Sequence, residues 1–158
     1  MIGRRWDKEH YILGYKPKSK IMYDIGFNWA VGDKWRNKNW PQESWEELTL
    51  LLGNKYSIDR QRGLSNLYDY MDWINSCRLI ITNDSLGMHL AMALRKKFIA
   101  FFGPSSSKEV YLYGLGKILT PEVDYKCIPC LSRECHQSKN CMYFITPQRV
   151  KSEVEKVL

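Results

Sequence analysis

The stretch Leu79–Phe102 reads LIITNDSLGMHLAMALRKKFIAFF and contains the pattern of a strand, a polar turn, a helix and a second strand. The apolar, β-branched run Leu79–Thr82 predicts a buried strand, and Phe98–Phe102 predicts the next one. Between them, Asn83–Ser85 occupy the place of a helix N-cap, and apolar residues at helical spacing continue beyond His89. The stretch therefore predicts a βαβ unit, and with it an α/β fold built on a parallel sheet flanked by helices.

In such a sheet, ligands bind beyond the carboxyl ends of the strands, where helix N-termini offer free N–H groups to anions. Asp84, Ser85, Gly87 and His89 fall at this place. Ser85 and the first-turn N–H groups can hold a phosphate, Gly87 permits a close approach of the backbone, and His89 can donate to a phosphate oxygen. Asp84 fits beside an anion either as a helix cap or as an acceptor for sugar hydroxyls. The alternative is that Asp84 only caps the helix and His89 is a half-buried histidine with its hydrogen bonds satisfied.

A second strand, basic loop and helix precede this unit. Ile21–Asn28 predicts a strand, residues 29–40 a loop, and Gln42–Leu52 a helix that starts after Pro41. Lys38 lies just before that helix and is a candidate to pair with a phosphate. Taken alone this signal is weak, because lysines are common in loops.

The remaining elements follow from the same patterns. We expect short strands at Tyr56–Asp59, Val110–Tyr113 and Lys117–Leu119, and a helix at Leu67–Ser76. A terminal helix is expected over residues 147–158, with Val150, Val154 and Val157 facing inward. Residues 1–20 form a basic lead-in segment, which we interpret as an arm or linker. We expect residues 21–158 to form a single Rossmann-like domain.

Composition limits the class of protein. The 158 residues are 44% hydrophobic and 13% aromatic, which indicates a folded domain. No run approaches the roughly 20 apolar residues of a membrane span, and the N-terminus lacks the apolar region of a secretory signal, so we expect a protein inside the cell. The net charge of +7 favours an anionic partner, which could be a nucleotide, a nucleic acid or an acidic membrane surface.

Four of the five cysteines lie in the cysteine segment, residues 127–141. Cys127, Cys130, Cys135 and Cys141 could bind a structural zinc ion as thiolates, with His136 as a substitute ligand. Their spacing is tighter than that of a zinc ribbon, so reduced, buried or reversibly paired thiols are the favoured interpretation, and we expect no metal. The chain also lacks GxSxG, HExxH, Walker and GxGxxG motifs, which leaves hydrolase, zinc-protease and kinase interpretations without support.

The motifs together resemble a known family. The run TNDSLGMHLAMAL, the strand that ends in FFGPSS, the CIPC pair with CHQSKNCM after it, and ITPQRV before the last helix are similar to the C-terminal half of the family 9 glycosyltransferases, the ADP-heptose:lipopolysaccharide heptosyltransferases. The likeness covers residues 21–158 and includes Asn39–Pro41 and Trp45. It implies one half of a GT-B arrangement, in which two Rossmann-like domains face each other across a cleft and the C-terminal one binds the nucleotide-sugar donor.

The resemblance also implies roles for single residues. Asp84 corresponds to the sugar-contacting aspartate of the family, and Ser85, Gly87 and His89 correspond to its diphosphate-binding turn. Lys38 corresponds to the lysine that holds the donor phosphate. The family usually places glycine directly after the Asp-Ser/Thr pair, whereas Leu86 intervenes here.

The family's acceptor-binding N-terminal domain has no counterpart in these residues. That domain supplies the carboxylate that acts as general base, so the resemblance implies a donor domain that is incomplete without a separate or missing acceptor domain. Its substrate would be an ADP-heptose-like donor, its acceptor a lipopolysaccharide-type glycan, and its place the cytoplasm, with a peripheral contact to the inner membrane. The alternative is a non-catalytic basic module of the same fold that binds an acidic surface or, less favoured, nucleic acid.

Overall fold

The computed structural model describes residues 7–158, and its centre is a five-stranded sheet in which all neighbouring strands run parallel. The strand order is β2-β1-β3-β4-β5. In chain order the strands are β1 (Tyr23–Asn28), β2 (Ile58–Arg60), β3 (Cys77–Asn83), β4 (Lys97–Phe101) and β5 (Gly116–Leu119). The α-helices are α1 (Gln42–Leu52), α2 (Leu67–Ser76), α3 (Leu86–Ala93) and α4 (Pro147–Val157). Short 3-10 helices are η1 (Asp33–Lys38), η2 (Gly53–Lys55), η3 (Ser107–Glu109) and η4 (Cys141–Phe144).

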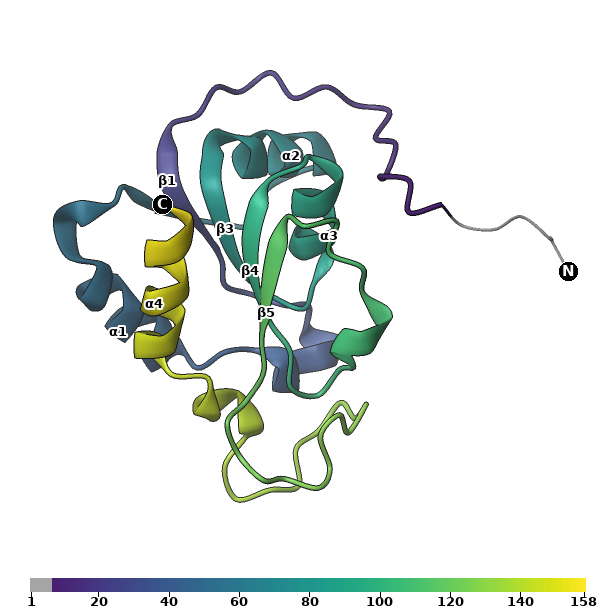
Figure 1. The fold of residues 1–158 in the computed structure, drawn as a ribbon, viewed down its shortest axis with the longest axis vertical. Helices are drawn as coiled ribbons and strands as arrows, with labels where there is room; N and C mark the ends of the chain where they lie inside the picture. The colour runs from purple at the N-terminus through teal and green to yellow at the C-terminus, as the bar shows by residue number, and fades with distance from the viewer. Residues whose placement is uncertain (1–6) are drawn as a thin grey trace, which may run out of the picture.

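The helices cover both faces of the sheet, with α1 and α4 on one face and α2 and α3 on the other (Figure 1). Alternating side chains of each strand enter the two layers. Leu79 and Ile81 of β3 join the core beneath α1 and α4, whereas Ile80 joins the core beneath α2 and α3. Strands buried on both faces have nearly continuous apolar sequences, which explains the run that the sequence shows at β3. The predicted α/β class and Rossmann-like sheet are confirmed.

The predicted helix boundaries agree closely with the structure. The expected ranges of α1 and α2 match the observed ones. Gly53 ends α1 with φ of 57°, a left-handed conformation that glycine adopts without strain. Thr146 caps α4 by accepting a hydrogen bond from the Arg149 backbone N–H. These ends are set by local residues, and local reasoning therefore finds them.

Three expectations about the fold were wrong in detail. Val110–Tyr113 is no strand, because Tyr113 has φ of 54° and turns the chain before β5. The loop over residues 29–40 contains the 3-10 helix η1. Val157, expected to face inward, is 40% exposed, since α4 ends there and has passed the edge of the core formed by Val150 and Val154.

The lead-in predicted for residues 1–20 lies partly outside the described residues, which begin at 7. From residue 7 to 20 the chain has no helix or strand and passes along α2 (Figure 1). Asp72 of α2 fixes it: its carboxylate accepts from the Tyr15 hydroxyl at 2.9 Å and from the Lys18 backbone N–H at 2.7 Å. Among the helices of residues 7–158, none has both the length and the apolar character needed to cross a membrane.

Candidate functional site

The predicted site residues lie where parallel strands end and the chain turns into helices. β1 leads into the loop that carries η1, and β3 leads into the β3–α3 turn, residues 83–87. β1 and β3 are neighbours in register, with Asn28 opposite Thr82. The two loops are therefore side by side at the carboxyl edge of the sheet.

Lys38 and Asp84 meet across these loops, although 46 positions separate them. The Lys38 Nζ lies 2.6 Å from the Asp84 Oδ2, and the two side chains are only 16% and 14% exposed. The ring of Trp35, in the same loop, lies 5.0 Å from the Lys38 Nζ. The sequence singled out both charged residues, and the structure places them together as an ion pair.

Asn83 fixes the geometry of both loops and was not identified as a site residue from the sequence. Its Oδ1 accepts from the Trp40 backbone N–H at 2.9 Å, and its Nδ2 donates to the Trp29 carbonyl at 2.9 Å. The side chain is fully buried. A buried amide with both ends bonded holds the loop after β1 against the end of β3, and so sets the separation of Lys38 and Asp84.

Ser85 is the N-cap residue of α3, and its side chain makes no capping bond to the helix. Its Oγ instead lies 2.8 Å from the Nδ2 of the buried Asn28. The interpretation of Asp84 as only a helix cap is wrong, since Ser85 occupies that position and the Asp84 carboxylate lies on Lys38. The open amino end of α3 leaves backbone N–H groups available to an anion.

Gly87 is required for a packing reason that the sequence did not predict. We expected glycine to admit a ligand close to the backbone. A Cβ at this position would collide with the Asn28 side chain and with the Tyr70 hydroxyl, which lie inside the protein. Gly87 therefore makes room for a buried polar group behind the turn.

His89 lies apart from the Lys38–Asp84 pair in its contacts. Its side chain is exposed, which contradicts the half-buried alternative. It lines a hollow of about 520 Å³ together with Tyr11, residues 108–111 and Tyr113. His89 lies one helical turn from the amino end of α3. Within the described chain, no hydrogen bond joins it to Lys38 or Asp84.

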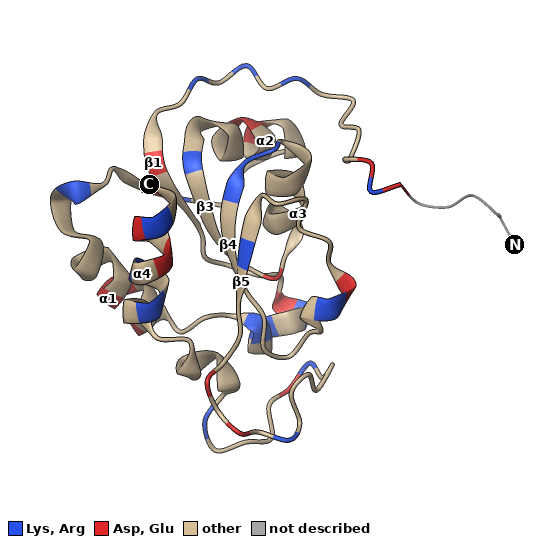
Figure 2. Cartoon of the chain, viewed as in Figure 1, with Lys and Arg blue, Asp and Glu red and all other residues tan. Residues whose placement is uncertain are grey.

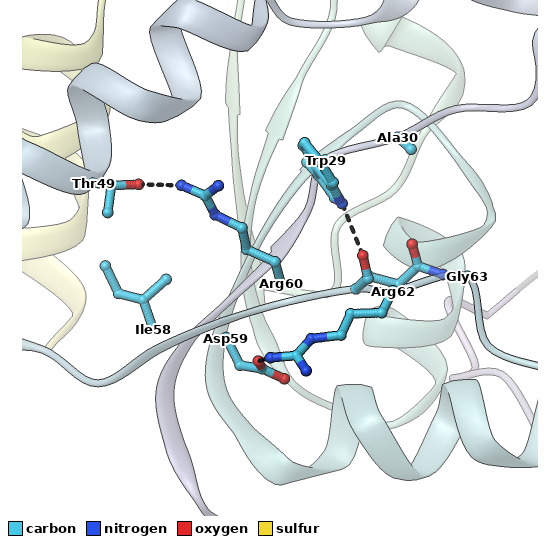
Figure 3. A pocket seen from close by; sticks show the side chains of 9 residues that line it. Trp29, Ala30, Thr49, Ile58, Asp59, Arg60, Arg62 and Gly63 are labelled. Carbon is cyan, nitrogen blue, oxygen red and sulfur yellow. Dashed lines mark hydrogen bonds and ion pairs between the residues drawn. The ribbon is translucent and has the colours of Figure 1, made fainter.

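A second hollow, of about 710 Å³, opens beyond the ends of β1 and β2 and was missed from the sequence (Figure 3). Trp29 forms one wall, and its indole N–H donates to the Gln61 carbonyl at 2.8 Å. The Arg60 guanidinium lies 5.8 Å from the Trp29 ring centre and donates to the Thr49 hydroxyl at 2.8 Å. The signal that could have found this hollow is the run IDRQRG, which places two arginines at and just after the end of a short strand.

The cysteine segment packs against the loop that carries Lys38. The Leu131 backbone N–H donates to the Pro104 carbonyl at 2.8 Å, and Asn140 Nδ2 donates to the Asn37 carbonyl at 3.1 Å. The Asn37 amide in turn donates to the Ser132 carbonyl. These contacts join the segment to η1 and to the loop after β4.

The four thiols of the segment have different environments. Cys127, Cys130 and Cys135 are exposed and Cys141 is buried. Burial, reinforced by the three neighbouring cysteines, raises the pKa of the Cys141 thiol to about 11. Within residues 7–158 no group of three or more histidine, cysteine or acidic side chains is arranged to hold a metal ion.

The positive charge is not gathered on one face. Figure 2 shows lysines and arginines on the N-terminal segment, the helices and the loops, with acidic residues among them. At the carboxyl edge, the partly buried cations include Lys38 and Arg60. The site therefore presents a local charge rather than a broad basic surface.

Known proteins are similar to this chain in sequence and in fold. The model of glycosyltransferase family 9 (heptosyltransferase) matches residues 63–140. Lipooligosaccharide heptosyltransferase 2 of Haemophilus ducreyi is 32% identical over 165 aligned positions, which cover 99% of this chain and 44% of that protein.

Two solved structures of Escherichia coli proteins have the same fold. The ADP-heptose lipopolysaccharide heptosyltransferase II matches with a TM-score of 0.66 at 22% identity, over 89% of this chain and 47% of that one. Heptosyltransferase WaaC with ADP-2-deoxy-2-fluoro heptose matches with a TM-score of 0.61 at 18% identity, over 89% and 44%. The chain thus spans about half the length of these relatives. From the family match and the identity along nearly its whole length, the chain belongs to glycosyltransferase family 9, the heptosyltransferases.

Proposed function

We propose that this chain binds the donor of a heptosyl transfer, a nucleotide-diphosphate heptose of the ADP-heptose kind, at the β3–α3 turn. The observation that carries the proposal is the contact of the Lys38 ammonium with the Asp84 carboxylate at the amino end of α3. A cation and open backbone N–H groups suit a diphosphate, and a carboxylate suits a polyhydroxyl sugar joined to it. The solved WaaC structure, with a fluorinated ADP-heptose, supports the choice of ligand class.

Lys38 and the first turn of α3 would stabilise the leaving group. When the bond between the anomeric carbon and the phosphate oxygen breaks, negative charge grows on the departing nucleoside diphosphate. An ammonium and fixed N–H dipoles aimed at that oxygen lower the energy of the transition state more than that of the bound substrate. The two bonds from the Asn83 side chain to the loop after β1 keep these groups in place before the ligand arrives.

Asp84 would orient the sugar. A carboxylate can accept as many as four hydrogen bonds, so Asp84 can hold Lys38 and sugar hydroxyls at the same time. A negative charge close to a diphosphate disfavours binding of the phosphates alone. The pair is therefore better suited to a nucleotide sugar than to a free nucleotide.

The hollow between Trp29 and Arg60 would hold the nucleoside. Its volume of about 710 Å³ and its aromatic wall suit a purine ring, and the polar side chains around it suit ribose hydroxyls (Figure 3). Asn83 Nδ2 bonds to the Trp29 carbonyl, which connects this hollow to the β3–α3 turn. One ligand could extend from the hollow to Lys38.

The acceptor hydroxyl must also lose its proton, and we assign no general base to this chain. We propose that a separate acceptor domain provides it and that the acceptor is a lipopolysaccharide-type glycan. The reaction would take place in the cytoplasm, at the inner membrane where such an acceptor is anchored. No metal or cofactor enters this scheme.

Calorimetry with ADP and the 158-residue chain tests the proposal. We expect saturable binding, and a Lys38→Ala variant should bind at least tenfold more weakly, because hydrogen bonds to charged groups contribute about 1.5–3 kcal/mol. Lys34→Ala is the matched control, since Lys34 is an exposed lysine of the same 3-10 helix and should leave the affinity unchanged. A folded wild-type chain that binds neither ADP nor another nucleoside diphosphate would refute the proposed function.

A further inference from the structure

A chain of hydrogen bonds runs through the protein behind Ser85. The Tyr70 hydroxyl on α2 donates to Asn28 Oδ1 at 2.6 Å, and Asn28 Nδ2 lies 2.8 Å from both Thr82 Oγ1 and Ser85 Oγ. Asn28 and Thr82 are 1% and 0% exposed. We call these four side chains the Ser85 relay. The scheme for donor binding uses only its last member.

Thr82 determines the direction of the relay. Its Oγ1 lies 2.7 Å from the Asn83 carbonyl oxygen, which can only accept, so the Thr82 hydrogen is committed there. The Asn28 atom 2.8 Å from Thr82 must then be a donor, which identifies it as the amide nitrogen. The oxygen of the same amide therefore faces the Tyr70 hydroxyl, and the side-chain amide has one consistent orientation.

The second hydrogen of that amide nitrogen points to Ser85. Because Ser85 Oγ accepts from Asn28, its own hydrogen must be donated elsewhere. Thr82 Oγ1, at 3.4 Å, is too distant for a strong bond. Ser85 is partly exposed at the amino end of α3, so its hydroxyl is set to donate outward, toward the place where an anion would bind.

Tyr70 and Gly87 maintain the relay. Burial raises the pKa of Tyr70 to about 12, so the phenol keeps its proton and remains a donor throughout the neutral range. Gly87 provides the space in which the Tyr70 hydroxyl meets Asn28. An alanine here would separate the two groups, so the glycine and the relay depend on each other.

We infer that Tyr70 and Asn28 are positioning residues for donor binding: they hold the Ser85 hydroxyl so that its hydrogen is free to be donated to the diphosphate. The inference rests on the proposed function and deepens it, because it assigns two buried residues that do not touch the ligand. A hydroxyl whose hydrogen points outward suits a fully ionised phosphate oxygen, which can only accept. The relay thus makes the β3–α3 turn selective for the diphosphate group.

A double-mutant cycle measured by calorimetry with ADP tests this inference on the full chain. Tyr70→Phe should weaken ADP binding by roughly threefold to tenfold, the range of one neutral hydrogen bond, and Ser85→Ala by about tenfold or more. The double variant should bind as Ser85→Ala does, because Tyr70 acts through Ser85. Tyr68→Phe, two residues away on α2 and exposed, is the matched control and should bind as the wild type does.

Adenosine lacks phosphates, so its affinity distinguishes a role in phosphate binding from a merely structural role. Its affinity should be the same in all of these variants, whereas general damage to α2 would lower it. Asn28→Asp should weaken ADP binding at least tenfold and leave adenosine binding unchanged. The new carboxylate would accept the Ser85 hydrogen, so the Ser85 hydroxyl could no longer donate it to a phosphate. If that variant does not fold, the Tyr70→Phe cycle decides alone.

The outcomes separate the two claims. Losses from Tyr70→Phe and Ser85→Ala that add in the double variant would overturn the relay and leave the proposed donor site intact. A wild-type chain that binds no ADP would refute the proposed function and the relay with it. Coupled losses for ADP, with adenosine binding unchanged, would establish both.

Discussion

The β3–α3 turn and the cysteine segment carry the two most distinctive residue patterns of the chain, and the fold holds them in different ways. The turn joins two regular elements, and buried side chains such as Asn28 and Asn83 satisfy its polar groups. The cysteine segment contains no strand or α-helix, and its contacts with the rest of the domain include hydrogen bonds to the carbonyls of Pro104 and Asn37. Three of its four thiols are exposed.

This difference indicates where chemistry can be preorganised. A ligand group acts best when the side chains that hold it are themselves fixed by packing and by further hydrogen bonds. The β3–α3 turn meets that condition through the Ser85 relay. The cysteine segment covers one side of the Lys38 loop, to which it is joined by hydrogen bonds at Asn37.

Gly87→Ala should produce the largest effect and disturb the tighter of the two regions. The new Cβ would overlap Asn28 and Tyr70, so we expect the free energy of unfolding to fall by about 1–3 kcal/mol, as in overpacked cores. ADP binding should weaken as well, since the relay opens. Urea denaturation and calorimetry measure the two effects.

The control for this variant is Gly32→Ala. No atom lies within 4 Å of a Cβ built at Gly32, and its φ of -60° suits alanine. The free energy of unfolding should change by no more than about 0.5 kcal/mol. Equal losses in the two variants would contradict the tight packing that we assign to the turn.

Asp84→Asn should separate nucleotide binding from sugar binding. The change removes a charge that holds Lys38 and repels phosphate, so ADP should bind roughly threefold to tenfold more tightly, the range expected for one partly exposed ion pair. ADP-heptose should gain less or bind more weakly, because the sugar loses its acceptor. Calorimetry with both ligands measures the ratio; an equal loss for both would show that Asp84 serves only the structure.

The smallest effect is expected in the cysteine segment. At pH 8, iodoacetamide should modify Cys127, Cys130 and Cys135 well before Cys77 and Cys141. Burial raises the pKa of Cys77 and of Cys141 to about 11, which leaves both thiols protonated and unreactive at that pH. Mass spectrometry of the labelled peptides gives the order.

The same labelling tests the zinc interpretation that the sequence left open. We expect equal rates before and after treatment with a chelator. A faster reaction of the segment's cysteines after chelation would reveal a bound metal that shields the thiols. The cysteine segment would then be held as firmly as the turn, and the contrast between the two regions would fail.

Much of the fold could be predicted because its signals are local. The strand runs, the helix after Pro41 and the N-cap before α3 depend on residues that are neighbours in the sequence. The candidate site could be predicted in part for the same reason. Lys38 and Asp84 each follow a strand of a parallel sheet, so both had to reach one edge.

The rest depends on contacts between distant residues, which no local pattern contains. Asn28 and Tyr70 read as an ordinary strand end and an apolar helix position, and only the packing of α2 against the turn shows their common role. The reason for Gly87 is likewise hidden until those side chains are placed. The hollow beside Trp29 forms only where the ends of β1 and β2 lie next to α1, so no local pattern reveals it.

A crystal structure of the chain with ADP tests the central claim most directly. We predict phosphate oxygens within hydrogen-bond distance of Lys38 Nζ and Ser85 Oγ, at the amino end of α3, with the base beside Trp29. A diphosphate bound elsewhere on the chain, with no ligand atom within hydrogen-bond distance of Lys38 Nζ or Ser85 Oγ, would contradict the account.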